Sequence, residues 1–373
     1  MKTRTFFSVG IAILLIVMSS CESKEFIDGS LKKQGTTEQS EFITLKSGAI
    51  VEKHGDKYIW QDDILLSDTQ YKLLDETGDI IQDPANEEVL DASNVVRVNL
   101  TTGYDYIPYD VKTRSTAIYP TPYNMWAMVR FTYAKEGTGT TLNANTRELI
   151  RQALHHWEAN TNVRFYNATD QPTIDPTYGF AYPYVNFCDG TSNASYVGRI
   201  GGRQDLTLVP GGATVGTVIH EIGHATGLLH EQCRYDRDNY IIVNTNNIEL
   251  NARSNFTKRT SNYYCIGAFD FGSIMLYSSY TGFEIDPSIP SMTRTDESIF
   301  WAQRTGLSDL DRRFPNTFYV PYIARSDTYY ELAETVYKPD NTVMTPAERL
   351  QLQAELNNGS PTPPAGGRIP NEF

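Results

Sequence analysis

Three of the six histidines in this 373-residue chain lie within eleven residues of one another, at positions 220, 224 and 230. The segment reads H-E-x-x-H-x-x-G-x-x-H, with Glu221 directly after the first histidine. Residues four apart on a helix lie on one face, one turn apart, so His220 and His224 are able to bind one metal ion. The spacing therefore predicts a metal-binding helix around which the rest of the fold has to be built.

Gly227 lies three residues beyond the second histidine of this motif. Glycine permits a left-handed backbone turn, which ends the helix early and reverses the chain. The reversal brings His230 to the same metal as a third ligand. Three protein nitrogens and one open position are typical of a catalytic Zn²⁺ site, whereas a structural site is closed by four ligands. Glu221 is then placed to act as general base on a zinc-bound water.

Hydrophobic spacing predicts an α+β fold around this site. Apolar residues at helical spacing predict a helix over 146–157, and the histidine motif lies on a second helix over 214–229. Alternating and aromatic runs predict strands over 126–133, 163–166, 182–187 and 205–209. Residues 22–114 contain strand-like runs at 57–66 and 95–100 but no long helical period, and residues 240–319 show loop and turn signals with short helices.

The charge balance and the N-terminus restrict partners and location. The formal net charge is −13, which disfavours a nucleic-acid-binding protein because such proteins present basic surfaces. Lys2 and Arg4 precede an apolar run over 6–18, a pattern that predicts an export signal and is too short for a membrane span. The sequence before Cys21 resembles the lipobox of bacterial lipoproteins, although plain cleavage before Cys21 is an open alternative. In both cases the protein is exported.

The other cysteines are Cys188, Cys233 and Cys265. In an oxidising compartment we expect a structural disulfide among them. We favour the pair Cys233 and Cys265, because they flank a region that returns to the same site. Cys188 is then unpaired, or it pairs with Cys21 if Cys21 is not lipidated.

Beyond the histidine motif, the chain resembles the astacin family of zinc metalloproteases, within the metzincins. The stretches that carry the resemblance are Glu231, Ser195–Arg199, Gln204, Arg237–Tyr240, Asn255–Phe256, Asp270–Met275 and Gly306–Ser308. The resemblance implies a twisted, mostly parallel sheet with an active-site helix, a second long helix and an irregular C-terminal subdomain. It divides the chain into a signal peptide (1–20), a propeptide (21–114), an astacin-like catalytic domain (115–319) and a partly flexible C-terminal extension (320–373).

The resemblance also implies roles for single residues. Met275 belongs to the methionine turn expected beneath such a site. Tyr277 would ligate zinc and swing out to support the oxyanion, and Glu231 would hold the mature N-terminus through a buried ion pair. The mature chain would begin near Ser115, directly after Arg114, where a trypsin-like protease would cut. Two departures are Leu276 in place of the usual histidine and a missing cysteine before the zinc helix, so the family's disulfides do not transfer to this chain.

A zymogen also needs a group that blocks the open position on zinc. Astacin propeptides use the aspartate of a Phe-x-Gly-Asp motif, and Asp63 in Trp60-Gln61-Asp62-Asp63 resembles it imperfectly. We prefer Asp63, with Asp79 after Gly78 as an alternative. Cys21 is a rival if it is not lipidated, because a thiolate is a better zinc ligand than a carboxylate.

The sequence therefore predicts a secreted zinc endopeptidase that acts on protein or peptide substrates and is activated by propeptide removal near Arg114. If Cys21 is lipidated, the precursor is anchored to the outer membrane or held in the periplasm before release. One alternative is a zinc amidase acting on cell-wall peptides, which shares the chemistry. Another is a non-catalytic zinc-containing binding module, against which the intact Glu221 argues, since binding needs no general base.

Overall fold

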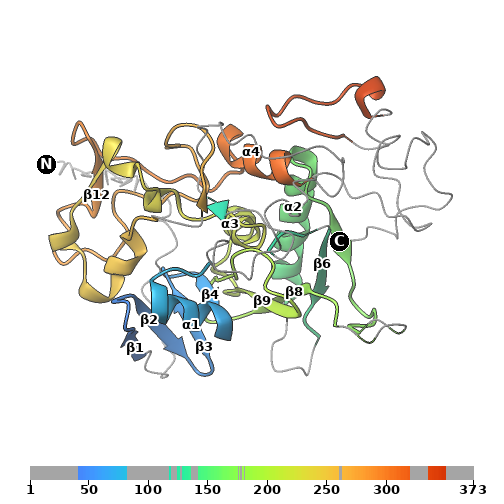
Figure 1. The fold of residues 1–373 in the computed structure, drawn as a ribbon, viewed down its shortest axis with the longest axis horizontal. Helices are drawn as coiled ribbons and strands as arrows, with labels where there is room; N and C mark the ends of the chain where they lie inside the picture. The colour runs from blue at the N-terminus through green and yellow to red at the C-terminus, as the bar shows by residue number, and fades with distance from the viewer. Residues whose placement is uncertain are drawn as a thin grey trace, which may run out of the picture.

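The computed structural model describes residues 41–81, 117–118, 124–126, 128–135, 142–174, 176, 179, 181–259, 263–319 and 335–349. The expected export signal, Cys21, the strand expected over 95–100 and the cleavage site at Arg114 lie outside the described residues. Residues 41–81 form a leader unit. The described residues from 117 onward form a main unit, and the two units pack side by side (Figure 1).

The leader unit is an antiparallel sheet followed by a helix. Its elements are β1 (Glu41–Thr44), β2 (Ile50–His54), β3 (Lys57–Trp60), β4 (Ile64–Leu66) and α1 (Asp68–Thr77), with the strands in sequence order across the sheet. The helix was not expected, because ten residues are too few to show a repeating apolar pattern. Its caps specify it: Ser67 and Gln70 form a reciprocal capping box, and Gly78 ends it in the left-handed conformation.

A parallel sheet with two helices is the frame of the main unit. The strands β6 (Val129–Tyr133), β7 (Phe165–Asn167), β8 (Tyr184–Asp189) and β9 (Arg203–Leu208) lie in the order β7-β6-β8-β9, all parallel. Helices α2 (Ala144–Asn160) and α3 (Val215–Ala225) pack against each other, and the indole of Trp157 donates a hydrogen bond of 3.1 Å to Ile219 O. The predicted α+β fold is confirmed.

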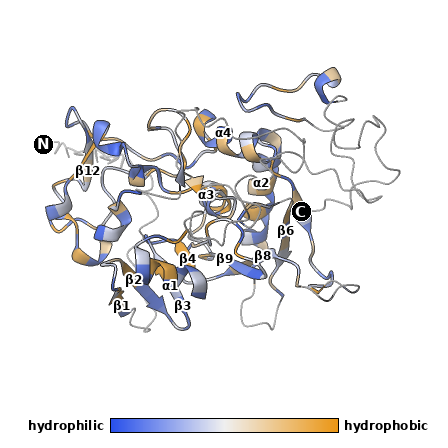
Figure 2. Ribbon diagram, viewed as in Figure 1, coloured by the Kyte–Doolittle hydropathy of each residue, from blue (hydrophilic) through white to orange (hydrophobic). Residues whose placement is uncertain are grey.

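Apolar side chains from both units form one continuous core. Buried residues of the leader unit, including Val51, Trp60 and Ile64, belong to the same cluster as Phe131 and Trp157 of the main unit. Figure 2 shows the hydrophobic colouring of α3 and of β4, the leader strand nearest to it. The leader unit is therefore packed as part of the fold.

The C-terminal part of the main unit is irregular, as predicted. It contains η1 (Glu231–Cys233), η2 (Arg237–Asn239), β10 (Ile241–Val243), η3 (Thr245–Asn247), η4 (Leu250–Phe256), β11 (Tyr263–Tyr264), β12 (Met292–Arg294) and α4 (Asp309–Phe318). β10 pairs with β12, and β11 pairs with β5 (Ala117–Ile118), both antiparallel. Between residues 231 and 256, the described chain forms four short 3₁₀ helices and one short strand, β10.

Residues 335–349 pack against the segment that directly follows α2. Tyr337 N donates to Asn162 Oδ1 over 2.8 Å, and Asn162 Nδ2 donates to Tyr337 O over 2.7 Å. Residues 346–349 are helical, as expected for the start of the piece over 346–356, and the remainder lies outside the described residues. Within the described ranges, no helix combines the length and the apolar character needed to cross a membrane.

Candidate metal centre

The three histidines come from α3 and the turn that follows it. Thr214 caps the start of the helix by accepting a hydrogen bond of 3.1 Å from Thr217 N. The helix ends at Ala225, earlier than the periodicity alone indicates, because Gly227 adopts φ +106°. An added Cβ at Gly227 would lie 2.9 Å from Ile118 Cγ1, so only glycine fits this turn.

The imidazole rings converge on one point. The ring centroids of His220 and His224 are 4.8 Å apart, and that of His230 lies 5.5 and 4.8 Å from them. Nδ1 of His220 donates to Ile274 O over 2.8 Å, and Nδ1 of His224 donates to Leu228 O over 2.9 Å. Because a carbonyl only accepts, each of these two rings keeps its Nε2 lone pair for a metal.

A fourth ligand atom comes from the leader unit. Asp63 Oδ2 lies 3.2 Å from Nε2 of His220 and 3.1 Å from Nε2 of His230. Its Oδ1 lies 3.5 Å from Nε2 of His224. In the described part of the chain, these four residues form the group able to hold a metal ion.

The separations fit zinc. A tetrahedral zinc site with bonds of about 2.1 Å has ligand-to-ligand edges of about 3.4 Å. The distances from Asp63 to the histidines, 3.1 to 3.5 Å, match such edges. Burial lowers the pKa of His220 to about 4 and shifts the pKa of His230 in the same direction, which favours the neutral imidazole that ligates metal. The three histidines therefore suit Zn²⁺ as protein ligands, with the carboxylate at the fourth position.

Glu221 lies beside the histidines on α3. Its side chain is buried, and Oε2 has no hydrogen-bond partner among the residues that the structure describes. Burial, together with the nearby Asp63 carboxylate, raises the pKa of Glu221 well above its ordinary value. A buried carboxylate that lacks a structural partner is the arrangement expected of a group reserved for proton transfer.

Met275 and Tyr277 pack close to the histidines. An added Cβ at Gly223 would lie 2.8 Å from Met275 Sδ, so the methionine packs directly against the metal helix. The ring centroid of Tyr277 lies 4.8 Å from that of His230, and its hydroxyl donates to Gln61 O over 3.0 Å. Met275 therefore packs against the helix that carries two of the histidines, and Tyr277 packs against the third.

Asp311 supports this turn and was not found from the sequence. Its carboxylate accepts from Ser273 Oγ over 2.6 Å and from Ile274 N over 2.9 Å. Since Ile274 O in turn accepts from His220, the aspartate fixes the backbone that orients a metal ligand. Nothing in the sequence around residue 311 links it to the histidines, which are 81 or more positions away.

Glu231 is buried beside the metal ligands and is bound within the main unit. Its Oε1 accepts from Arg234 Nη1 over 3.1 Å and from Asp270 N over 2.9 Å. Burial raises the pKa of Glu231 to about 7. The chain re-enters the described structure nearby, where Ile118 N donates to Gly227 O over 2.8 Å.

The other latency candidates lie elsewhere. Asp79 Oδ1 is 3.5 Å from Arg259 Nη1, and Asp79 does not belong to the metal group of the described chain. Cys21 lies outside the described residues. Asp63 is therefore the candidate that the structure brings to the histidines.

The expected disulfide between Cys233 and Cys265 is wrong, because the described cysteines form no disulfide. Cys233 is buried; its thiol donates to Asn255 O over 3.2 Å and lies 3.5 Å from Gln61 Nε2. Cys233 instead faces Gln61 of the leader unit. Cys188 is buried separately, with its sulfur 3.8 Å from Leu206 O.

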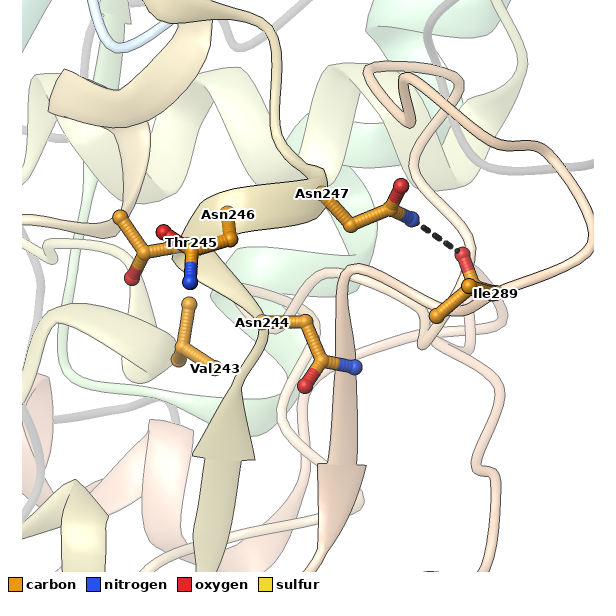
Figure 3. A pocket seen from close by; sticks show the side chains of 6 residues that line it. All are labelled: Val243, Asn244, Thr245, Asn246, Asn247 and Ile289. Atoms are coloured by element: carbon orange, nitrogen blue, oxygen red, sulfur yellow. Dashed lines mark hydrogen bonds between the residues drawn. The ribbon is translucent and has the colours of Figure 1, made fainter.

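A pocket of about 430 Å³ lies away from this centre, around η3. Its lining residues are Val243, Asn244, Thr245, Asn246, Asn247 and Ile289 (Figure 3). Asn247 Nδ2 donates to Ile289 O over 2.8 Å across it. No ionisable side chain lines this pocket, so it offers no acid, base or charged ligand for catalysis.

Comparisons with known proteins agree with the geometry of the site. The family model described as Astacin (Peptidase family M12A) matches residues 119–320. Flavastacin from Elizabethkingia meningoseptica is 37% identical over 203 residues, which are 54% of this chain and 43% of flavastacin. Zinc metalloproteinase nas-38 from Caenorhabditis elegans is 38% identical over 181 residues, which are 47% of this chain and 23% of that protein. The chain thus spans less than half the length of either relative.

Among solved structures, one similar chain is high choriolytic enzyme 1, a hatching enzyme zinc-protease from Oryzias latipes (medaka fish). It is 27% identical, and the match covers 54% of this chain and 98% of that chain, with a TM-score of 0.46.

Proposed function

The chain belongs to the astacin family, and from this premise we propose that it is an exported zinc-dependent endopeptidase that acts on protein or peptide substrates. The observation that carries the proposal is the convergence of three histidines beside the buried carboxylate of Glu221. A binding module would need the histidines but not the carboxylate, since only hydrolysis needs a general base.

Zinc bound to the three histidines supplies the Lewis acid that activates water and polarises the scissile carbonyl. Glu221 takes the proton of the attacking water and delivers it to the leaving amine. The hydroxyl of Tyr277 donates to the oxyanion that develops on the carbonyl. In the structure this hydroxyl donates a hydrogen bond of 3.0 Å to the backbone carbonyl oxygen of Gln61. This contact supports the proposed role, because a substrate carbonyl is an acceptor of the same kind.

We further propose that residues 21–114 are a propeptide and that Asp63 keeps the precursor latent. The position of its carboxylate, 3.1 to 3.5 Å from the three Nε2 atoms, supports this role, because a ligand there excludes water from the metal. The backbone adds to the docking: Ser195 N donates to Asp63 O and Leu65 N donates to Ser195 O, each over 2.9 Å. An extended substrate would need the same strand edge.

Activation then consists of a cut near Arg114 by a trypsin-like protease and removal of the propeptide. The new N-terminus near Ser115 would reach Glu231, whose buried carboxylate is held by Arg234 in the precursor. The route along β5 supports this, because Ala117 pairs with Leu228, three residues before Glu231. We also propose export through the segment 1–20, either as a freely secreted chain or through a precursor lipidated at Cys21.

The test is hydrolysis of casein by the full chain before and after limited trypsin, with and without 1,10-phenanthroline. We expect activity to arise after a cut near Arg114 and to disappear with the chelator. Bound zinc without hydrolysis of any protein would contradict the endopeptidase and favour a cell-wall amidase or a binding module. Digestion of isolated cell-wall peptides then separates these two.

The matched control is Glu221→Gln, which preserves shape and removes the base. We expect this variant to bind zinc as the unsubstituted chain does, measured by atomic emission, and to lose at least about a thousandfold in kcat/KM. Hydrolysis retained by the variant would refute the assigned role of Glu221.

A further inference from the structure

The peptide unit between Leu276 and Tyr277 is bonded on both edges by side chains from distant segments. Its N–H, on Tyr277, donates to Oε1 of Gln232 over 3.2 Å. Its carbonyl oxygen, on Leu276, accepts from Nη1 of Arg304 over 3.3 Å. A peptide unit is planar and includes the Cα atom of its second residue. The two bonds therefore act as a clamp that fixes the direction in which the Tyr277 side chain leaves the backbone.

The side chain of Gln232 is fully buried, but only its oxygen has a described partner. The residue is 0% exposed. Oε1 accepts from Tyr277 N, whereas Nε2 has no hydrogen-bond partner among the described residues. A buried amide nitrogen without a partner lowers stability, and an apolar side chain of similar shape would avoid that cost. The bond from its oxygen to Tyr277 therefore explains this glutamine better than packing does.

The segment that contains Gln232 also contains the third histidine. His230 lies two residues earlier, and its ring centroid is 4.8 Å from that of Tyr277. Between them, Glu231 N donates to Met275 O over 3.1 Å, on the peptide that precedes the clamped one. One short segment therefore fixes a metal ligand and the tyrosine relative to each other.

Arg304 connects the other edge of the same peptide to the metal helix. An added Cβ at Gly216, in the first turn of α3, would lie 1.8 Å from Arg304 O. The backbone of the arginine therefore lies directly against this helix. Its Nη1 also donates to Gln303 O over 2.9 Å, which holds the guanidinium close to its own backbone. Arg304 thus couples the position of α3 to the carbonyl of Leu276.

Both side chains of the clamp belong to the main unit, in contrast to the partner of the phenol hydroxyl. That hydroxyl donates to Gln61 O in the leader unit. Removal of the leader unit takes this acceptor away and leaves the bonds from Gln232 and Arg304 to the peptide in place. In the activated chain, the clamp still directs the tyrosine towards the point where the leader carbonyl lay.

We propose that Gln232 and Arg304 are positioning residues, which aim the hydroxyl of Tyr277 at the oxyanion by holding the peptide unit before it. Each acts through the tyrosine and not on the substrate. An oxyanion donor acts in the transition state, so a misdirected hydroxyl lowers kcat and leaves KM nearly unchanged. A displacement of about 1 Å lowers the rate by about a hundredfold. This inference rests on the proposed endopeptidase activity.

The experiment is a double-mutant cycle on the trypsin-activated full chain, with a fluorogenic peptide built on a cleavage site found in casein. Gln232→Met removes the acceptor and keeps the approximate size, and we expect kcat to fall by about tenfold with KM within about twofold. Tyr277→Phe should lower kcat by about a hundredfold. In the Tyr277→Phe background, Gln232→Met should lower kcat by less than about twofold, because the group through which it acts is already absent. Rates are divided by bound zinc.

Arg304→Met is measured in the same two backgrounds. It should lower kcat by about tenfold where the Tyr277 hydroxyl is present and by less than about twofold where it is absent. If Gln232→Met does not fold, this half of the cycle decides. Arg312→Met is the matched control, because Arg312 is also half-buried and donates from Nε to a backbone oxygen, Asn160 O, over 3.0 Å. It should keep the kcat of the unsubstituted chain.

Gln232→Glu tests rescue, since it keeps an acceptor oxygen for Tyr277 N, and kcat should stay within about threefold. Equal losses with and without the Tyr277 hydroxyl would show that the residues act on the fold or on Glu221, and would overturn the positioning role. Unchanged kcat in the single variants, or a change in KM alone, would do the same. Full activity of Tyr277→Phe would overturn the oxyanion role and the clamp with it, but not the endopeptidase. Absence of hydrolysis by the unsubstituted activated chain, for every peptide and protein, would overturn the endopeptidase proposal and this inference with it.

Discussion

The metal-ligand segment 220–230 and the leader residues that face it are specified in different ways. The segment contains its own instructions: a capped helix, two histidines one turn apart, and a glycine at φ +106° that returns the third. Asp63 reaches the same point from 157 positions away in the sequence, through strand pairing and a shared core. The chemistry is thus encoded locally, while its control depends on the whole fold. Substitutions in the metal-ligand segment should abolish activity. Substitutions in the leader unit should change how much activity the uncut precursor shows.

The largest effect is expected in the local region, from His230→Gln. Loss of one of three protein ligands should release most of the zinc, because neutral glutamine is a poor zinc ligand. We expect kcat/KM on casein to fall by more than about a thousandfold after trypsin treatment. Zinc content by atomic emission is the direct measurement.

His54→Gln in the leader unit is the control for this variant, since His54 pairs with Glu52 far from the centre. It should retain zinc and activity. Zinc retained at full stoichiometry by His230→Gln would show that His230 is not a ligand. It would also refute the claim that the segment 220–230 supplies all three histidine ligands.

A smaller effect of opposite sign is expected in the leader unit, from Asp63→Ala. Removing the carboxylate opens the fourth position while the remaining leader contacts persist. We expect casein hydrolysis by the uncut chain to rise by about tenfold over its basal level, still below that of the trypsin-activated chain. Asp62→Ala, which changes the exposed neighbour, should leave the basal level unchanged.

The variant Cys21→Ala tests the alternative hypothesis that Cys21, rather than Asp63, keeps the precursor latent. If the thiolate blocks the metal, this variant and not Asp63→Ala will show the raised basal activity. That result would refute Asp63 as the latency ligand. Its contacts would then only help to hold the leader unit against the main unit.

The two regions also differ in how far the sequence predicted them. The histidines, Glu221 and Gly227 followed from a motif, because each acts through residues a few positions away, whereas the position of Met275 followed from the resemblance to the family. The strands of the parallel sheet and the two main helices were predicted from the spacing of apolar residues. The contact of Gln232 with Tyr277 and the anchoring role of Asp311 did not follow, because contacts between distant segments leave no local pattern. The disulfide failed for the same reason: sequence position gave no indication that Cys233 faces Gln61.

A third prediction concerns one of those distant contacts. Asp311→Ala should destabilise the protein by about 3 kcal/mol, since it leaves Ser273 Oγ and the buried amide of Ile274 without their acceptor. Urea unfolding measures the change. Asp309→Ala, two residues earlier on α4 with a side chain that is 87% exposed, should change the unfolding free energy by less than about 0.5 kcal/mol. Equal effects of the two variants would show that Asp311 acts only through helix propensity.

The smallest expected effect is a pH dependence of the unfolding free energy. It arises at the contact between α2 and the loop that precedes α4. His156 Nε2 accepts a hydrogen bond of 3.1 Å from Leu307 N, which requires the neutral ring. Burial, with the nearby Arg312, lowers the pKa of His156 in the folded state. The unfolded chain, with a histidine pKa of about 6.5, therefore binds the proton more readily, and stability falls as pH drops below about 6.5.

His156→Gln keeps an acceptor for Leu307 N and cannot titrate, so its unfolding free energy should lose this part of the pH dependence. We expect the difference between the two chains to change by about 1 kcal/mol between pH 8 and pH 5, measured by urea unfolding. His155→Gln, which alters the exposed neighbouring imidazole, is the matched control and should follow the unsubstituted chain. Parallel curves for His156→Gln and the unsubstituted chain would mean that the bond to Leu307 is dispensable. The contacts that join α2 to α4 would then depend on packing rather than on this polar link.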